Sequence, residues 1–247
     1  MNTEIESISK WIKNYVEIAH AKGAVVGISG GKDSLVVAGL CVKALGKENV
    51  VGVIMPNNIM SDYEDAVDTC KFLGIRYVVT EIGTPYNAII KNVEESLARL
   101  DCKLTSVTTI NTAPRLRTTT LYAIAGSLNY LVANTSNLSE GVVGYTTKWG
   151  DNIGDFGPIC EFTKSEVVEL GLALGLPENL VRKAPSDGLS GQTDEAKLGV
   201  TYESIDRLVR LNEKDENYEK IIHLNEISKH KRNGVVKYHS NRKNYLE

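Results

Sequence analysis

Cysteine is scarce in this chain, and no part of it is a long hydrophobic run. Four cysteines stand far apart among 247 residues, at positions 41, 70, 102 and 160, and none belongs to a Cys-x-x-Cys pair. This spacing argues against a zinc site, an iron–sulfur site and a disulfide framework, and it fits a reducing compartment. Charged residues and glycines interrupt every apolar stretch before it reaches the length of a membrane span. We therefore expect a cytoplasmic protein with no membrane partner.

An excess of positive charge is also missing. The chain has 28 Lys and Arg against 31 Asp and Glu, a net charge of −3. It therefore offers no basic footprint for nucleic acid as a whole. Residues 1–4 carry neither the basic nor the apolar region of a secretory signal. Basic residues do gather beyond residue 228, after an acid-rich stretch at 212–226, and a basic chain end is by default a solvated one.

Strand and helix patterns alternate along the first 134 residues. Thr3 and Glu6 fit a capping box, and apolar residues at helical spacing follow them. Short apolar runs predict strands at 24–28, 50–55, 75–79 and 130–134, with helical patterns between them that include a long one near 113–129. Strands that alternate with helices form parallel βαβ units. The sequence therefore predicts an α/β fold: a doubly wound, mostly parallel, Rossmann-like sheet with helices on both faces.

The pattern after residue 160 is helical. Thr163 and Glu166 fit a second capping box, and two helices are predicted between residues 201 and 231. No low-complexity linker or composition shift marks a boundary. We expect a single domain over residues 1–247 with a helical C-terminal part and a mobile tail from about residue 229.

The loop SGGKDS at residues 29–34 carries the strongest functional signal. It joins a predicted strand to a predicted helix, an arrangement that points the free N–H groups of the first helical turn at an anion. The serines add hydroxyl donors, and Asp33 offers a carboxylate for a divalent cation. An ordinary Gly-rich turn needs none of these side chains. A Walker A motif is excluded because Asp33 stands where that motif requires Ser or Thr.

This loop resembles the S-G-G-x-D-S loop of the ATP pyrophosphatases, which cut ATP between its α and β phosphates. Other segments resemble the NAD synthetase family within that group. They lie at residues 111–117 (N-x-x-A-R-x-R), 135–151 (T-S-N-x-S-E…T-K-x-G-D) and 183–199 (K-x-P-S-x-x-L…Q-T-D-E…L-G), with H-K-R at 230–232. The similarity runs from about residue 5 to 243. Pro114 and Lys32 are mild departures from the family pattern.

The resemblance implies a set of site residues. The residues implied for ATP binding are Gly27, Ile28, Ser29, Gly30, Gly31, Lys32, Asp33, Ser34, Thr135, Lys164 and Ser186. The residues implied for deamido-NAD binding are Arg115, Lys148, Asp155, His230 and Lys231. Asp33 and Glu140 are implied as ligands of a Mg²⁺ cofactor, with ATP as co-substrate. Asp33 and Lys164 are implied as the catalytic pair.

The reaction that the resemblance implies is ATP-dependent amidation of deamido-NAD to NAD by ammonia. It proceeds through an acyl adenylate and releases AMP and pyrophosphate, so the protein would be a ligase of NAD biosynthesis. A glutaminase domain would need some hundreds of further residues, so free ammonia is the expected nitrogen donor. The family's substrate site at a subunit interface implies a homodimer. An apolar helical stripe offers a self-complementary surface for it: Leu121, Tyr122, Ile124, Ala125 and Leu128.

Two other functions share some of these features. Transfer-RNA thiolases and lysidine synthetases have a similar loop, but the former usually use paired cysteines and both favour a basic surface. The isoelectric point near 5.9 and the isolated cysteines argue against them. A non-enzymatic adenine-nucleotide sensor would use the loop for binding alone. Glu140 and the block at 148–155 argue against a sensor, because binding alone needs no second dinucleotide site.

Overall fold

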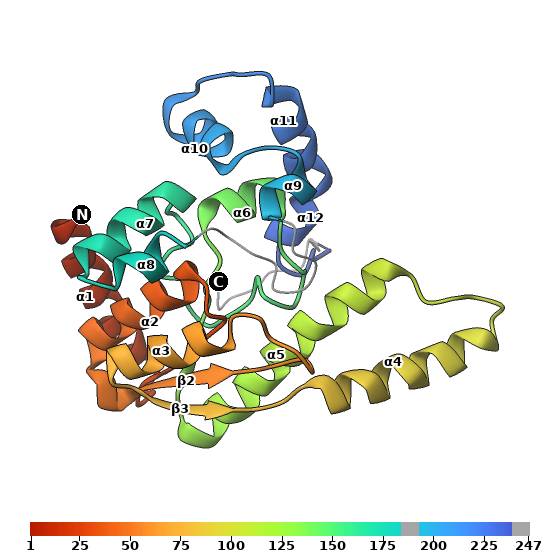
Figure 1. Cartoon of the computed structure of the whole chain (residues 1–247), viewed down its shortest axis with the longest axis horizontal. Coiled ribbons are helices and arrows are strands. Elements are labelled where there is room, and N and C mark those ends of the chain that lie inside the picture. The colour runs from red at the N-terminus through yellow and green to blue at the C-terminus, as the bar shows by residue number, and fades with distance from the viewer. Residues whose placement is uncertain (184–192, 239–247) are drawn as a thin grey trace.

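A four-stranded parallel sheet organises the protein (Figure 1). The computed structural model describes residues 1–183 and 193–238. The strands are β1 (Ala24–Gly27), β2 (Val50–Ile54), β3 (Arg76–Val79) and β4 (Leu131–Ala133). Their order is β3-β2-β1-β4, and each neighbouring pair is parallel. The predicted parallel α/β sheet is confirmed, and each strand is one or two residues shorter than its apolar run.

Helices cover both faces of the sheet, as the doubly wound prediction requires (Figure 1). One face carries α1 (Asn2–Ile18), α2 (Lys32–Leu45), α3 (Tyr63–Leu73), α7 (Lys164–Ala173) and α8 (Glu178–Val181), with the short 3₁₀ turn η1 (Lys47–Asn49) after α2. The other face carries α5 (Ser106–Leu128). Side chains alternate along β1. Val26 therefore packs into the core under α1 and α2, and Val25 packs into the core under α5.

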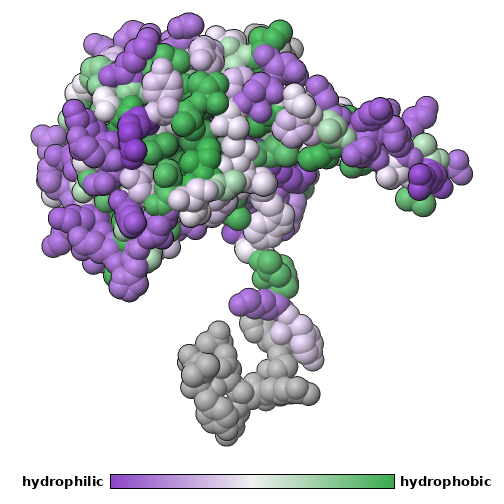
Figure 2. Space-filling model, turned by 90° about the horizontal axis from the view of Figure 1, so that it is seen from below, coloured by the Kyte–Doolittle hydropathy of each residue, from purple (hydrophilic) through white to green (hydrophobic). Residues whose placement is uncertain are grey.

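Helices α4 (Gly83–Ala98) and α5 form an arm that projects from the body (Figures 1 and 2). Gly83 is the only buried residue of α4. Helix α5 begins seven residues before the predicted stretch at 113–129 and runs through Pro114. A proline removes the hydrogen bond to the carbonyl four residues earlier. Here that carbonyl belongs to Ile110, which is exposed on the arm, so water can hydrate it.

The C-terminal part is helical, as predicted, and has a small core of its own. It consists of α9 (Asp194–Leu198), α10 (Tyr202–Leu211), α11 (Tyr218–Ile227) and the short α12 (Lys229–Arg232), which pack beside α6 (Leu138–Val143). The core side chains are Val143, Leu198, Val200, Tyr202, Ile205 and Ile221. Across the described residues, the helices are all too short or too polar to span a membrane.

Two sequence predictions are wrong, one about the start of a helix and one about the surface of another. Helix α1 begins at Asn2 with Met1 as its N-cap, so Thr3 lies inside the helix and makes no capping box. The apolar stripe after Arg117 packs mainly against the protein's own sheet: Ala125 is 2% exposed, and Leu121, Ile124 and Leu128 contact the same core. Tyr122 keeps about a third of its surface exposed. The stripe is therefore part of the core rather than a free dimer surface.

Candidate functional site

The loop at residues 29–34 is folded around two serine hydroxyls. Ser29 Oγ accepts from the backbone N–H of Gly31 (3.2 Å) and lies 3.2 Å from Ser34 Oγ. Ser34 Oγ donates to the carbonyl of Gly31 (2.9 Å). Gly30 has a φ of +80°, and a Cβ there would lie 2.3 Å from the carbonyl oxygen of Asp62. Only glycine fits this position, for both reasons.

The loop leads directly into the N-terminus of α2. Gly31 is the N-cap, and no side chain caps the helix. Because the first N–H groups of a helix have no partner within it, those at Lys32, Asp33 and Ser34 are available to an anion. The geometry agrees with the phosphate site predicted from the sequence.

A lysine ammonium lies between two carboxylates beside the loop. Lys164 Nζ is 2.6 Å from Asp33 Oδ2 and 2.8 Å from Glu140 Oε1. Asn137 donates its side-chain amide to Asp33 (3.2 Å) and accepts from the backbone N–H of Glu140 (3.0 Å). Glu140 in turn accepts from the backbone N–H of Asn137, so the two residues form a capping box at the start of α6. Helices α2, α6 and α7 thus each contribute one charged group.

Burial controls the ionisation of this cluster. It raises the pKa of Glu140 to about 7, while the nearby Lys164 ammonium opposes the shift and Asp33 adds to it. Burial alone would lower the pKa of Lys164, but Asp33 and Glu140 raise it well above its usual range. Lys32 is half-buried nearby, and burial followed by the charge of Lys164 lowers its pKa. Lys164 therefore stays protonated and positively charged next to the loop.

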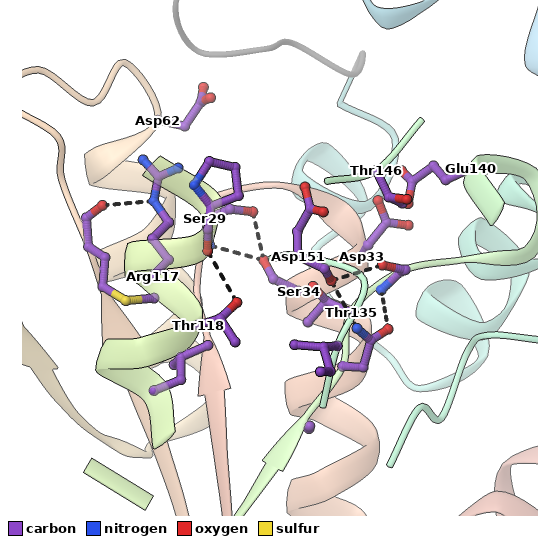
Figure 3. Close-up of a pocket in the computed structure, with 18 of the residues that line it drawn as sticks. Ser29, Asp33, Ser34, Asp62, Arg117, Thr118, Thr135, Glu140, Thr146 and Asp151 are labelled. Atoms are coloured by element: carbon purple, nitrogen blue, oxygen red, sulfur yellow. Dashed lines mark hydrogen bonds between the residues drawn. The ribbon is translucent and has the colours of Figure 1, made fainter. Parts of the chain in front are cut away.

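A cavity of about 400 Å³ opens where the carboxyl ends of β1 and β4 meet the loop (Figure 3). This edge is where an open α/β sheet binds its ligands. Among its described lining residues are Gly27, Ser29, Asp33, Ser34, Thr135 and Glu140, all predicted for the site. The sequence analysis gave no role to others, including Met55, Asp62, Arg117, Thr118, Thr146 and Asp151. A signal for two of them existed, because Arg117 and Asp151 belong to the quoted motifs.

A smaller pocket of about 120 Å³ adjoins the loop on its other side. Three lysines, at positions 32, 164 and 183, are among its described lining residues. The ammonium of Lys183 contacts Asp62 (2.5 Å) and Asp65, and these bonds raise its pKa against the effect of burial. Four carboxylates line the pocket as well, those of Asp33, Asp62, Glu140 and Asp194, so its charges suit a polyanion that carries a divalent cation.

Helix α10 supports Lys164 from the side opposite the loop. The ring of Tyr202 lies under the Lys164 ammonium, 5.1 Å from Nζ to the ring centroid. Asp206 accepts from Ser139 Oγ (2.5 Å) and from the backbone N–H of Ser165 (2.9 Å). Ser139 Oγ also accepts from the backbone N–H of Lys164 (2.9 Å). Tyr202, Asp206 and Ser139 are buried; Ser139 belongs to the quoted T-S-N-x-S-E segment, whereas no sequence motif included Tyr202 or Asp206.

The residues predicted for deamido-NAD fall into separate groups. Arg115 donates through Nε to the carbonyl of Lys148 (3.1 Å), so these two lie together. Asp155 accepts from the backbone N–H of Val132 (2.7 Å) and from the Tyr122 hydroxyl (3.3 Å).

The two predicted residues of α12 differ from one another. His230 is exposed, whereas Lys231 donates to the carbonyls of Gly144 (2.7 Å) and Thr146 (2.8 Å). None of the five predicted dinucleotide residues is among the described residues that line either pocket. Ser186, predicted for ATP, lies outside the described residues.

The glycine loop and the uncapped helix end at the carboxyl edge of a parallel sheet are typical of an α/β nucleotide-binding protein. The model of the NAD synthase family matches residues 4–245. The chain belongs to this family. It is 44% identical to the NH(3)-dependent NAD(+) synthetase of Thermococcus sibiricus over 218 residues, which cover 86% of this chain and 83% of that protein. It is 39% identical to the enzyme of the same name from Finegoldia magna over 242 residues, covering 97% of both.

A solved structure is also closely similar. The NMN synthetase of Francisella tularensis superposes with a TM-score of 0.86 at 35% identity, covering 96% of this chain and 98% of that one.

Proposed function

We propose that this protein is an ammonia-dependent NAD synthetase, which amidates deamido-NAD to NAD at the expense of ATP. The observation that supports it most directly is the Asp33–Lys164–Glu140 cluster, placed between the phosphate-type loop and the large cavity. Family membership over nearly the whole chain agrees with this chemistry. The name NH(3)-dependent NAD(+) synthetase, carried by a relative that aligns over 97% of both chains, also supports this chemistry.

The chain's own groups fit the two steps of such a reaction. The nicotinate carboxylate attacks the α-phosphate of ATP and displaces pyrophosphate. Backbone N–H groups of residues 32–34 and the ammonium groups of Lys32, Lys164 and Lys183 would stabilise the charge of the departing pyrophosphate. Ammonia then attacks the acyl adenylate and releases AMP and NAD. No protein nucleophile is required.

Asp33 and Glu140 fit a Mg²⁺ ion. Magnesium is commonly held by one or two carboxylates together with substrate phosphates and water. Both carboxylates contact the one Lys164 ammonium, so they lie close enough together to share a single cation, which supports this proposal. When bound, the ion would neutralise phosphate oxygens at the reacting end of ATP.

A second candidate substrate is the mononucleotide acid whose amidation gives NMN. The close structural similarity to the NMN synthetase of Francisella tularensis favours it. The dinucleotide remains our first choice, because the relatives named as NAD synthetases have higher sequence identity.

One assay tests the reaction. Purified protein with ATP, Mg²⁺, ammonium and either acid is expected to give AMP and the amide, with the dinucleotide acid as the better substrate. Because NH₃ is the nucleophile, the rate at limiting ammonium should rise with pH in the mildly alkaline range. Chromatography separates all products. Formation of ADP would exclude pyrophosphatase chemistry, and AMP without either amide would leave the loop chemistry and reject the substrate.

We expect a homodimer in solution. The arm exposes apolar side chains that a monomer would leave in water: Ile89, Val93, Leu100, Val107 and Ile110. Figure 2 shows this arm standing clear of the body. Light scattering at micromolar concentration should give twice the chain mass. The variant Ile110→Glu should shift the mass toward that of the monomer. Thr119→Glu is the control, because it places the same charge at an exposed position of α5 that is already polar, and it should leave the mass unchanged.

Removal of the chain after Ser228 should raise the KM for deamido-NAD or lower kcat at least about tenfold. It deletes His230 and the Lys231 ammonium, whose two bonds hold the backbone beside cavity residue Thr146. Hydrogen bonds from a charged group are each worth about 1.5–3 kcal/mol. A chain ending at Tyr238 is the control, because it keeps α12. Equal steady-state kinetics for the two truncations would mean that the tail is merely solvated.

A further inference from the structure

Arg117 is a cation of the large cavity that the described residues leave without an anionic partner. Its Nε donates to the carbonyl oxygen of Met55 (3.2 Å). Neither Nη atom donates a hydrogen bond to another described residue, and no carboxylate of the described chain lies within 4.0 Å of the guanidinium. Burial lowers the pKa of Arg117, and the charge of Asp151 opposes this only in part. The side chain is therefore a partly desolvated charge with free donors.

A packing role alone does not explain this arrangement. Burying a charge without a partner is costly, and an apolar side chain of similar length would fill the space more favourably. The bond to Met55 uses one of the five guanidinium donors and fixes the plane of the group. The remaining four make no hydrogen bond to another described residue. Figure 3 shows Arg117 among the residues that line the cavity.

The charges that line the cavity in the described part of the chain leave Arg117 as the cation available to an anionic ligand there. Four carboxylates line it, those of Asp33, Asp62, Glu140 and Asp151, and Arg117 is the only Lys or Arg among the lining residues that the structure describes. The lysines that suit the terminal phosphates of ATP line the smaller pocket instead. Among the described lining residues, an anionic group in the large cavity therefore has one cationic side chain to pair with, that of Arg117.

We infer that Arg117 binds an anionic oxygen pair at the reacting centre. Two groups carry one under the proposed function, on which this inference rests: the α-phosphate of ATP and the carboxylate of the nicotinate ring. Both present two oxygens to a guanidinium fork, which can donate two parallel hydrogen bonds. The pairing also lowers the repulsion between the attacking carboxylate and the phosphate. The resemblance to NAD synthetases implied a role for Arg115 and none for Arg117.

Binding measurements separate the two sources. Calorimetric titration of the wild type and Arg117→Met with ATP alone, deamido-NAD alone and NAD alone gives three affinities for each protein. If the fork holds the carboxylate, Arg117→Met should bind deamido-NAD about 10- to 100-fold more weakly and NAD equally well, since NAD carries an amide instead. If it holds the α-phosphate, the affinity for ATP should fall by that factor. The inference is overturned if all three affinities stay within twofold of the wild type.

Three further variants control the experiment. Arg207→Met removes an exposed arginine that pairs with Glu213, and it should change none of the affinities. Arg117→Lys keeps the charge without the fork and should recover part of the loss. Arg117→Gln keeps a donor for the Met55 carbonyl without the charge, so it decides the question by the same criteria if the Met variant does not fold. A wild type that forms neither amide rejects the proposed function, whereas an active wild type with unaffected Arg117 variants rejects only this inference.

Discussion

Replacement of Asp33 by Asn is expected to lower turnover by about a thousandfold or more while the protein stays folded. The carboxylate faces both the Lys164 ammonium and the place proposed for Mg²⁺. Interactions with charge at a metal in the transition state are worth several kcal/mol, and each 1.4 kcal/mol is tenfold in rate. Glu140 still pairs with Lys164 in the variant, so no buried charge is left alone. We expect a stability loss of about 1 kcal/mol.

The measurement is turnover at saturating Mg²⁺, with the folded state checked by circular dichroism and thermal unfolding. Asp68→Asn is the matched control, since Asp68 forms an exposed ion pair with Lys71 on α3. It should keep full activity. A folded Asp33→Asn protein with wild-type turnover would contradict the assignment of Asp33 to the site.

Replacement of Lys164 by Met is expected to destabilise the fold strongly as well as to abolish turnover. It leaves the largely buried carboxylates of Asp33 and Glu140 close together without the ammonium that they share. Breaking a buried ion pair by removing one partner typically costs about 3–5 kcal/mol. Chemical denaturation at pH 8 should report a loss of this size. Saturating Mg²⁺ should restore more stability to the variant than to the wild type, because the ion can replace the missing ammonium.

The loss should depend on pH in a defined direction. In the wild type, burial raises the pKa of Glu140 from 4.5 to about 7, and Lys164 holds it down. Without Lys164, the folded-state pKa must lie higher still. A carboxyl whose folded pKa exceeds its unfolded pKa binds more protons when folded, so stability falls as pH rises between the two values.

Denaturation at pH 5.5 should therefore recover much of the stability that Lys164→Met loses at pH 8. The double variant Glu140→Gln with Lys164→Met removes the titrating group and should show a weaker pH dependence. An equal loss at both pH values in the single variant would show that the two carboxylates do not carry the effect.

Local patterns were enough to predict the sheet, and they failed where a boundary depended on context. The strand runs and the box at Thr163 depend on neighbouring residues alone, and both are confirmed. Thr3 fits the same box, but the helix begins two residues too early for it, because Asn2 already has helical geometry. Pro114 is tolerated inside α5 because the arm exposes the carbonyl that it leaves free. Nothing in the local sequence says that the arm leaves the body.

Part of the site could be predicted from the sequence because its residues are neighbours along the chain. The loop is contiguous, so its residue types and order are visible together. The Asn137–Glu140 box has an equally local pattern, an Asn followed three positions later by Glu. The contact of Lys183 with Asp62 joins positions 121 residues apart, and the support of Lys164 by Asp206 passes through Ser139. Such pairings arise from tertiary packing and leave no periodic signal.

The long sequence separation of the Asp33–Lys164 ion pair also governs when the protein can become active during folding. These residues lie 131 positions apart, so the pair closes only after the sheet, α6 and the start of α7 have assembled. Contacts of this kind bear the entropy of closing a long loop before they contribute stability. Helices α1 and α2, by contrast, can form while the rest of the chain is unfolded or still on the ribosome. We therefore expect the helical signal to recover before the activity does when the protein refolds, because activity requires the whole chain.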